Sequence, residues 1–452
     1  MIHSVADKGR DLLNINGSAP SSKELRQLCE ELLTGAGEAR GTALAREVVR
    51  VLESMHGNAW PGFLEMLHEH MGPNPKRVME AVEAYRKEPG PETLIQLTRS
   101  VESPRQELFR RINLSPNGTL QLVRLREHLL RTLKDRPHLK SVDADLQHLF
   151  RAWFNRGFLE LKHIDWSSPA LILEKLVNYE SVHAIHGWRD LRRRLERDRR
   201  CYAFFHPALP DEPLIFVEVA LMRGIPDNAG LLLNRKAEIL DPEQADSAIF
   251  YSINNCQFGL RGISFGNFLI KQVTTDLKQE LPGLKNFATF SPVPGFAETL
   301  RRTDDKAPFT PERLRALLAD HEDTIREVSG KKDPAEGLRA LLDKPEVVRT
   351  HLADVLETLA LAYLTLVRRG KTVFDPVALF HLSNGAHLER INPLGDCSKE
   401  RWDASFGVMV NYVYEVDNVE RNHEKFVDSG KVNLSKQLQK KSKAIREVWK
   451  GG

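Results

Sequence analysis

The sequence predicts an α+β protein of two domains, in which an all-helical bundle precedes a mixed sheet with a helical insertion. Three observations predict this class. Residues 1–160 are expected to form the helical bundle, because apolar residues recur at helical spacing from Ser21 onwards and no strand-like run intervenes. Short apolar runs begin near residue 200 and enclose a glycine loop followed by a helix. A second helical block near 300–370 precedes two closing strands, so we expect the sheet domain to span 161–452.

Composition is typical of an ordinary globular protein. Hydrophobic residues make up 41% and charged residues 28% of the 452 residues, and the formal net charge of +3 does not call for nucleic acid as a partner. The four cysteines lack metal-site or disulfide spacing. No apolar run reaches the roughly 20 residues that span a bilayer, and the N-terminal segment lacks the apolar core of a leader peptide. We therefore expect a cytoplasmic protein without a metal site or a membrane partner.

The first domain reads as successive amphipathic helices. Ser21 and Glu24 form a capping box before a leucine-rich helix that ends near residue 33. A second helix gathers Leu44, Val48 and Leu52 on one face. Further helices are expected at 63–71, 75–85, 92–101, 120–133 and 146–157. Such a bundle could serve as a scaffold or an oligomerisation domain.

The second domain opens with a loop at 160–169, a helix at 173–186 and an arginine-rich segment at 188–200. The arginines form either an anion-binding patch or a solvated helix face. The interspersed acidic residues and the near-neutral chain favour the solvated face. Strands are then expected at 201–205 and 214–221.

A strand at 249–253, a glycine loop, a helix beginning at Phe268 and a strand at 287–290 form the most informative unit. Glycines let the backbone approach a ligand, and the N–H groups at a helix N-terminus attract a pyrophosphate. A turn needed only for tight packing is the alternative. The residues of this loop are Arg261, Gly262, Ile263, Ser264, Phe265, Gly266 and Asn267.

Two side chains beyond this loop are candidates for chemistry. Ser291 ends the strand at 287–290 and offers a hydroxyl, although a serine that merely caps a strand is the alternative. His381 lies in the last turn of a short helix that Asp375-Pro376 begins and Asn384-Gly385 ends. It is either a core residue or a proton-transfer group. Closing strands are expected at 386–392 and 406–415.

The order of these elements is similar to that of the acyl-CoA acetyltransferase (GNAT) superfamily, and 261–266 resembles its pyrophosphate loop with Ser264 at the first glycine position. Longer segments resemble malonyl-CoA decarboxylases, whose animal members have a glutamate at Ser264. They include Gly-Leu-Arg-Gly-Ile-Ser-Phe-Gly-Asn-Phe-Leu-Ile-Lys at 259–271 and Phe-Ser-Pro-Val-Pro-Gly-Phe at 290–296. The other segments lie at 199–207, 211–221, 249–253 and 380–386.

This resemblance implies a GNAT-like sheet that binds acyl-CoA and a helical domain that assembles a dimer or tetramer. It implies conversion of malonyl-CoA to acetyl-CoA and CO2 in fatty acid metabolism, without a cofactor. Ser291 would orient the substrate as proton acceptor, and His381 would donate the proton to C2. The loop at 261–267 would bind CoA, with Ser252 and Tyr414 as weaker candidates for the acyl pocket. The alternatives are a GNAT-type N-acyltransferase and a non-catalytic CoA-binding regulator.

Overall fold

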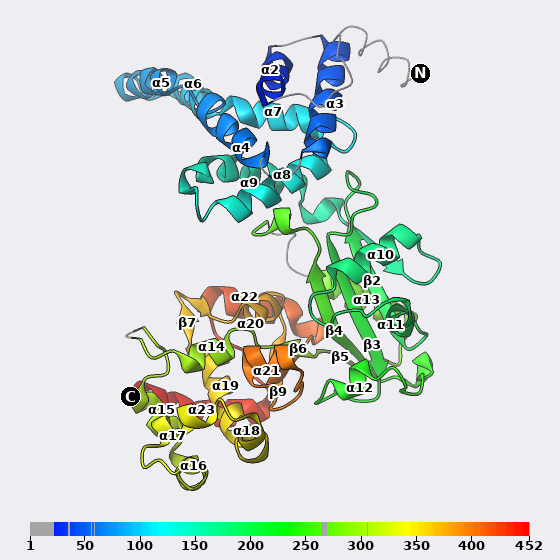
Figure 1. Cartoon of the computed structure of the whole chain (residues 1–452), viewed down its shortest axis with the longest axis vertical. Helices are drawn as coiled ribbons and strands as arrows, with labels where there is room; N and C mark the ends of the chain where they lie inside the picture. Colours follow the sequence, from blue (N-terminus) through cyan, green and yellow to red (C-terminus); the bar gives the residue numbers. More distant parts are fainter. Residues whose placement is uncertain are drawn as a thin grey trace. The chain divides into compact units, whose positions relative to one another are not determined.

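The computed structural model describes residues 22–34, 37–55, 57, 59–263, 269–304 and 306–451 (Figure 1). These residues form two compact units. The first comprises the described residues up to Glu160 together with 204–215 and 255–263. The second comprises 161–203, 216–254 and the described residues from 269 onwards. The glycine loop thus begins within the unit that contains the N-terminal helices.

The first unit is helical, as predicted. Its helices are α2 (Ser22–Leu33), α3 (Glu38–Ser54), α4 (Ala59–His70), α5 (Pro75–Lys87), α6 (Pro91–Val101), α7 (Pro104–Asn113), α8 (Gly118–Thr132) and α9 (Lys140–Trp153). The apolar face predicted for α3 is buried. Helix α7 was not predicted, because its sequence is dominated by charged and polar residues. It nevertheless buries Leu108, Phe109 and Ile112, so tertiary packing outweighs its weak amphipathic pattern.

Eight of the described strands form a mixed sheet in the order β1-β2-β3-β4-β5-β10-β6, with β9 paired to β10. Strands β4 and β5 are parallel, whereas β10 is antiparallel to β5, β6 and β9. The bounds are β1 Glu160–Ile164, β2 Arg199–Phe205, β3 Ile215–Met222, β4 Ser247–Asn255, β5 Asn286–Thr289, β6 Ser291–Pro292, β9 His387–Asn392 and β10 Met409–Val413. The helical N-terminal region followed by a mixed sheet confirms the predicted fold class.

One face of the central strands forms an apolar core that includes Ile249, Tyr251, Ala288, Phe290 and Met409. Because successive strand residues point to opposite faces of a sheet, the residues that alternate with this core point the other way. Thr289 and Ser291 belong to that second set, with Tyr412 and Tyr414 beside them on the neighbouring β10 segment. The pleat of the sheet thereby gathers polar side chains on one face.

Helices of the second unit that precede the insertion are α10 (Ala170–Tyr179), α11 (Trp188–Arg194), α12 (Gly230–Leu233) and α13 (Leu269–Glu280). Two predictions here were wrong. The helix expected at 173–186 ends at Tyr179, and the loop expected at 160–169 begins with strand β1. A strand of five residues with only Ile164 buried gives little apolar signal in sequence.

The predicted helical insertion is formed by α14 (Phe296–Arg301), α15 (Pro311–Leu317), α16 (Glu322–Ser329), α17 (Pro334–Leu341), α18 (Pro345–His351) and α19 (Ala353–Leu366). The single helix expected at 345–369 is two helices, since Leu352 leaves the helical conformation between α18 and α19. Strands β7 (Arg368–Arg369) and β8 (Thr372–Val373) form a small hairpin after them. The chain continues with α20 (Pro376–Ser383), α21 (Lys399–Ser405), α22 (Val419–Ser429) and α23 (Lys436–Gly451). Among the described helices, none is long and apolar enough to cross a membrane.

Candidate active site

The candidate site is built from β6, α20 and the end of β10. Ser291 opens β6, which is separated from β5 by Phe290 alone, and its backbone pairs with Val410 of β10. His381 is positioned by local chemistry: the Asp375 carboxylate accepts a hydrogen bond from Ala378 N at 2.8 Å and begins α20, as the sequence predicts. Gly385, with a φ of +82°, ends this helix. Both Ser291 and His381 are buried.

A continuous chain of hydrogen bonds joins four side chains at this site. Ser291 Oγ lies 3.0 Å from His381 Nε2 and donates to Thr289 Oγ1 at 2.8 Å. The other ring nitrogen of His381, Nδ1, lies 2.8 Å from the Tyr414 hydroxyl. Thr289 Oγ1 also accepts from Tyr412 N at 3.1 Å. Serine and histidine, 90 residues apart in sequence, are therefore in direct contact.

Burial keeps His381 uncharged. It lowers the imidazole pKa to about 3, because desolvation disfavours the charged ring. The ring also stacks on Tyr412, with centroids 4.6 Å apart. A neutral imidazole donates through one nitrogen and accepts through the other. The chain of partners is satisfied when Tyr414 donates to Nδ1 and Nε2 carries the hydrogen that faces Ser291, whose own hydrogen goes to Thr289.

Asp375 is a buried acidic residue beside the site. Burial raises the pKa of its carboxyl to about 7. One oxygen caps α20, and the other lies 3.4 Å from the Tyr363 hydroxyl, which also donates to Pro294 O at 3.2 Å. Asp375 therefore ties the start of the His381 helix to α19 and to the segment after Ser291.

The structure separates the two weaker acyl-pocket candidates. Tyr414 contacts His381, as described above, whereas the Ser252 hydroxyl donates to Glu180 Oε2 at 2.6 Å. Asn254 donates to the same carboxylate oxygen at 2.9 Å. No contact within the described ranges joins Ser252 to the Ser291–His381 pair.

The glycine loop is described up to Ile263, and Ser264, Phe265, Gly266 and Asn267 lie outside the described residues. Arg261 and Gly262 are exposed. Arg126 of α8, which is buried and paired with Asp143 at 2.8 Å, donates to Gly259 O at 2.6 Å and to Arg261 O at 2.9 Å. The beginning of the loop is thus fixed to the first unit by a side chain that sequence reasoning missed.

The arginine-rich segment at 188–200 is only partly the solvated face favoured by the sequence. Arg189, Arg192 and Arg197 are exposed. Arg193, by contrast, forms a two-pronged ion pair with Asp198 at 2.6 and 2.9 Å. Arg194 is buried and donates to Glu218 at 2.8 Å. The sequence could not distinguish the two sets because their acidic partners lie partly on β3.

Thr289 is the other site residue that sequence reasoning missed. The signal was available, since Thr289 precedes Ser291 by two residues and strand side chains repeat with a period of two. Any side chain at that position shares a face with Ser291.

Comparison with known proteins assigns the family. The model of the malonyl-CoA decarboxylase C-terminal domain matches residues 157–451, and the model of the N-terminal domain matches residues 71–154. The chain therefore belongs to the malonyl-CoA decarboxylase family, whose members are carboxy-lyases, as the sequence motifs predict.

Relatives agree with this assignment. Mitochondrial malonyl-CoA decarboxylase from Anser anser anser is 35% identical over 342 residues, covering 73% of this chain and 68% of the relative. The Rattus norvegicus protein is 35% identical over 343 residues, with 73% and 69% covered. The crystal structure of malonyl-CoA decarboxylase from Rhodopseudomonas palustris has 43% identity and a TM-score of 0.81, covering 93% of this chain and all of that one. The Agrobacterium vitis structure has 43% identity, a TM-score of 0.79, and 93% and 99% coverage.

Proposed function

We propose that this protein converts malonyl-CoA to acetyl-CoA and CO2. The observation that carries the proposal is the buried Ser291–His381–Tyr414 chain in a member of the malonyl-CoA decarboxylase family. In this reaction the bond from C2 to the departing carboxylate breaks, and its electron pair is delocalised into the thioester as an enolate. One proton must then reach C2.

Ser291 orients the substrate in this proposal. Its hydroxyl leaves Thr289 to hydrogen-bond the malonyl carboxylate or the thioester oxygen, and so holds the breaking bond perpendicular to the thioester plane. The same oxygen is the acceptor of the Nε2 hydrogen before substrate binds, at 3.0 Å. A malonyl group beside Ser291 Oγ is therefore within reach of that hydrogen.

His381 is the proton donor to C2. Because the imidazole is neutral, the proton comes from Nε2–H, and Tyr414 supplies its hydroxyl hydrogen to Nδ1, so that imidazolate does not form. Solvent restores the tyrosine hydrogen after product release. The thioester is the electron sink, so neither a metal ion nor an organic cofactor is part of this proposal. The loop at 261–267 holds the CoA pyrophosphate, with Arg261 and the backbone N–H groups as donors.

Incubation with malonyl-CoA as the sole substrate, followed by mass spectrometry, tests the proposed reaction. We expect acetyl-CoA, and in D2O we expect one deuterium at C2. An N-acyltransferase would require an acceptor amine and release free CoA, and a non-catalytic regulator would bind malonyl-CoA without turnover. Either of these results would contradict the proposal.

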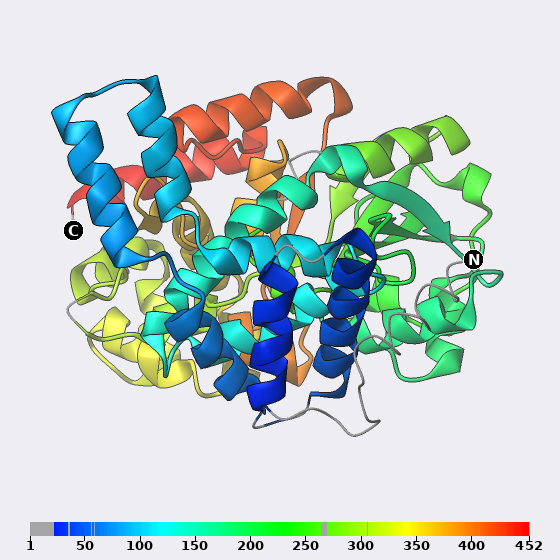
Figure 2. The same cartoon turned by 90° about the horizontal axis from the view of Figure 1, so that it is seen from above.

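We also propose that the chain self-associates as a dimer or tetramer through its helical unit. Helices α5 and α6 lie side by side in both views (Figures 1 and 2). They expose Met79, Leu94, Ile95 and Val101 to solvent, with Met79 58% exposed. Exposed apolar residues gathered on neighbouring helices favour an interface. Light scattering should give a multiple of the 51.4 kDa chain mass, and Ile95→Glu should reduce it.

For the cellular location we propose the cytoplasm, on the support of four cysteines that are scattered without disulfide or metal-site spacing. Fractionation of cells that express the protein should recover it with cytoplasmic markers. Recovery with membranes or with an organelle would contradict this location.

A further inference from the structure

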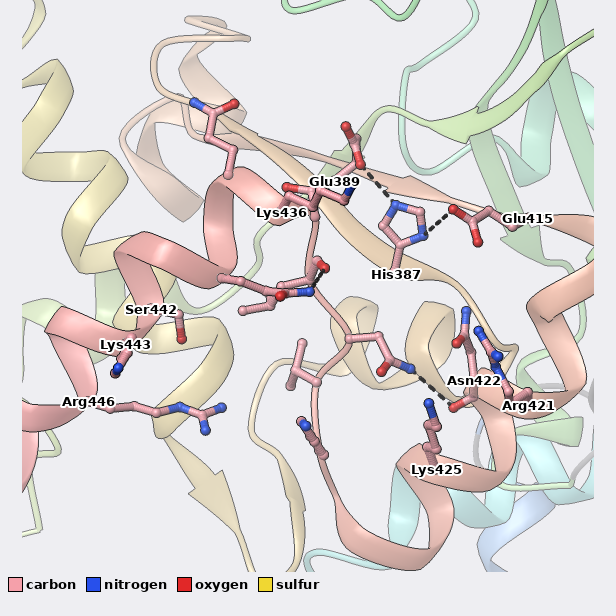
Figure 3. Close-up of a pocket in the computed structure, with 17 residues that line it drawn as sticks. His387, Glu389, Glu415, Arg421, Asn422, Lys425, Lys436, Ser442, Lys443 and Arg446 are labelled. Atoms are coloured by element: carbon pink, nitrogen blue, oxygen red, sulfur yellow. Dashed lines mark hydrogen bonds and ion pairs between the residues drawn. The ribbon is translucent and has the colours of Figure 1, made fainter.

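A cavity of about 890 Å³ lies between β9, the segment at 430–435 and helices α22 and α23 (Figure 3). Arg421 and Lys425 extend from α22 on one side, and Lys443 and Arg446 extend from α23 on the other. We call this cavity the basic groove. Its six cationic lining side chains are Arg421, Lys425, Lys431, Lys436, Lys443 and Arg446. Its two carboxylates, Glu389 and Glu415, both face His387 (Figure 3).

None of these six cations forms an ion pair with any carboxylate in the described part of the chain. Their neighbours do: Lys441 of α23 lies 2.7 Å from Glu357, and Lys271 lies 2.6 Å from Glu420. The groove thus combines positive charge with a shortage of negative partners, unlike the arginines of the 188–200 segment that are buried against carboxylates.

Arg446 gives an independent indication of the same imbalance. Its Nε atom is buried and has no hydrogen-bond partner within the described residues. Burial and, second, the nearby charge of Arg446 lower the pKa of Arg368. Arg368 itself donates only to carbonyl oxygens, those of Thr365 and Gly430. A guanidinium that nothing neutralises is a docking point for an anion.

We propose that the basic groove binds the phosphate groups of a nucleotide-like polyanion. Arginine forks and lysine ammonium groups suit phosphate oxygens, and the cavity volume falls within the range of small-molecule sites. Asn433 and Gln439 also line the groove and provide amides for the uncharged part of such a ligand.

The phosphate groups could belong to either of two ligands. One is the 3′-phosphate end of CoA, and this choice rests on the proposed function. The other is a separate polyphosphate effector. Helix α22 connects the groove to α13, which follows the glycine loop, and to α20, which carries His381. Its Glu420 pairs with Lys271 in the first turn of α13, and its His423 Nδ1 lies 2.6 Å from Ser383 O, at the end of the His381 helix. The same location therefore suits a CoA subsite or an effector that acts on α20.

Calorimetric binding of CoA, dephospho-CoA and tripolyphosphate distinguishes the sources. The variants are Lys443→Gln/Arg446→Gln on one wall and Arg421→Gln/Lys425→Gln on the other. Lys440→Gln/Lys450→Gln is the matched control, since it also removes two positive charges, from residues of α23 that do not line the groove. If CoA is the source, both groove variants bind CoA about tenfold or more weakly than wild type, and their affinity for dephospho-CoA is unchanged. If an effector is the source, tripolyphosphate binds the CoA-saturated wild type and its affinity falls similarly in both variants.

The proposal would be overturned if each of the three probes bound the groove variants as tightly as it binds Lys440→Gln/Lys450→Gln. Decarboxylation of malonyl-CoA by the wild type is measured in parallel, because its absence refutes the proposed function without bearing on tripolyphosphate binding. Circular dichroism of each variant confirms that it is folded. If the variant on one wall does not fold, the variant on the other wall still tests the proposal.

Discussion

Replacing Tyr414 with phenylalanine isolates the hydroxyl that holds His381. The change retains the ring in its buried position and removes only the partner that lies 2.8 Å from Nδ1. A buried polar atom left unsatisfied costs about 1–3 kcal/mol. His381 is only 3% exposed, so water cannot easily replace the lost bond. If the full cost is felt during proton transfer, kcat falls about fivefold to 150-fold.

Steady-state decarboxylation measured by acetyl-CoA formation tests this expectation. The loss should lie in kcat with little change in KM, because Tyr414 acts through His381 rather than on the substrate. Tyr85→Phe makes the same chemical change on α5 and should leave both constants unaltered. An unchanged kcat in Tyr414→Phe, or a loss confined to KM, would refute the assignment of Tyr414 as the group that positions and reprotonates the imidazole.

Two further predictions concern stability. The pKa of Asp375 is about 7 in the folded state, against about 3.9 for an aspartate in the unfolded chain, so the folded state binds more protons. The protonated carboxyl therefore contributes fully to the stability of the fold below about pH 4, and this contribution is lost as pH rises through 7. Asp375→Asn retains the helix cap and should raise Tm relative to wild type more at pH 8 than at pH 5, and an equal difference at both pH values would contradict this. Arg126→Met removes the ion-pair partner of the buried Asp143, which keeps the neutral Gln147 amide as a donor, and should cost about 3–5 kcal/mol in urea unfolding. The exposed Arg131→Met on the same helix should cost under about 1 kcal/mol, and similar losses in both would refute the structural role of Arg126.

Local sequence was sufficient for the elements whose boundaries are encoded locally. Helix α20 begins at Asp375-Pro376 and ends at Asn384-Gly385, so its bounds and the place of His381 in its last turn could be predicted. The central strands were visible because both of their faces are buried, which gives continuous apolar runs.

Partnerships across the sheet could not be predicted in the same way. Ser252 and Tyr414 were equivalent weak candidates in sequence, and only the pairing of Val413 with Ala288 fixes where β10 delivers Tyr414. Glu180, which accepts the Ser252 hydrogen bond, lies 72 residues away on another element. The same limit applies to Arg194, since its partner Glu218 belongs to β3.

The decarboxylation rates of His381→Ala and Ser291→Ala, set beside their affinities for CoA, test the central claim most directly. With malonyl-CoA alone, wild type should form acetyl-CoA, whereas each variant should lose about a hundredfold or more in kcat because the proton donor or the orienting hydroxyl is gone. CoA affinity should remain within a few fold of wild type, since neither residue is assigned to the CoA pyrophosphate. Near-wild-type decarboxylation by either variant, with CoA binding intact, would contradict the account.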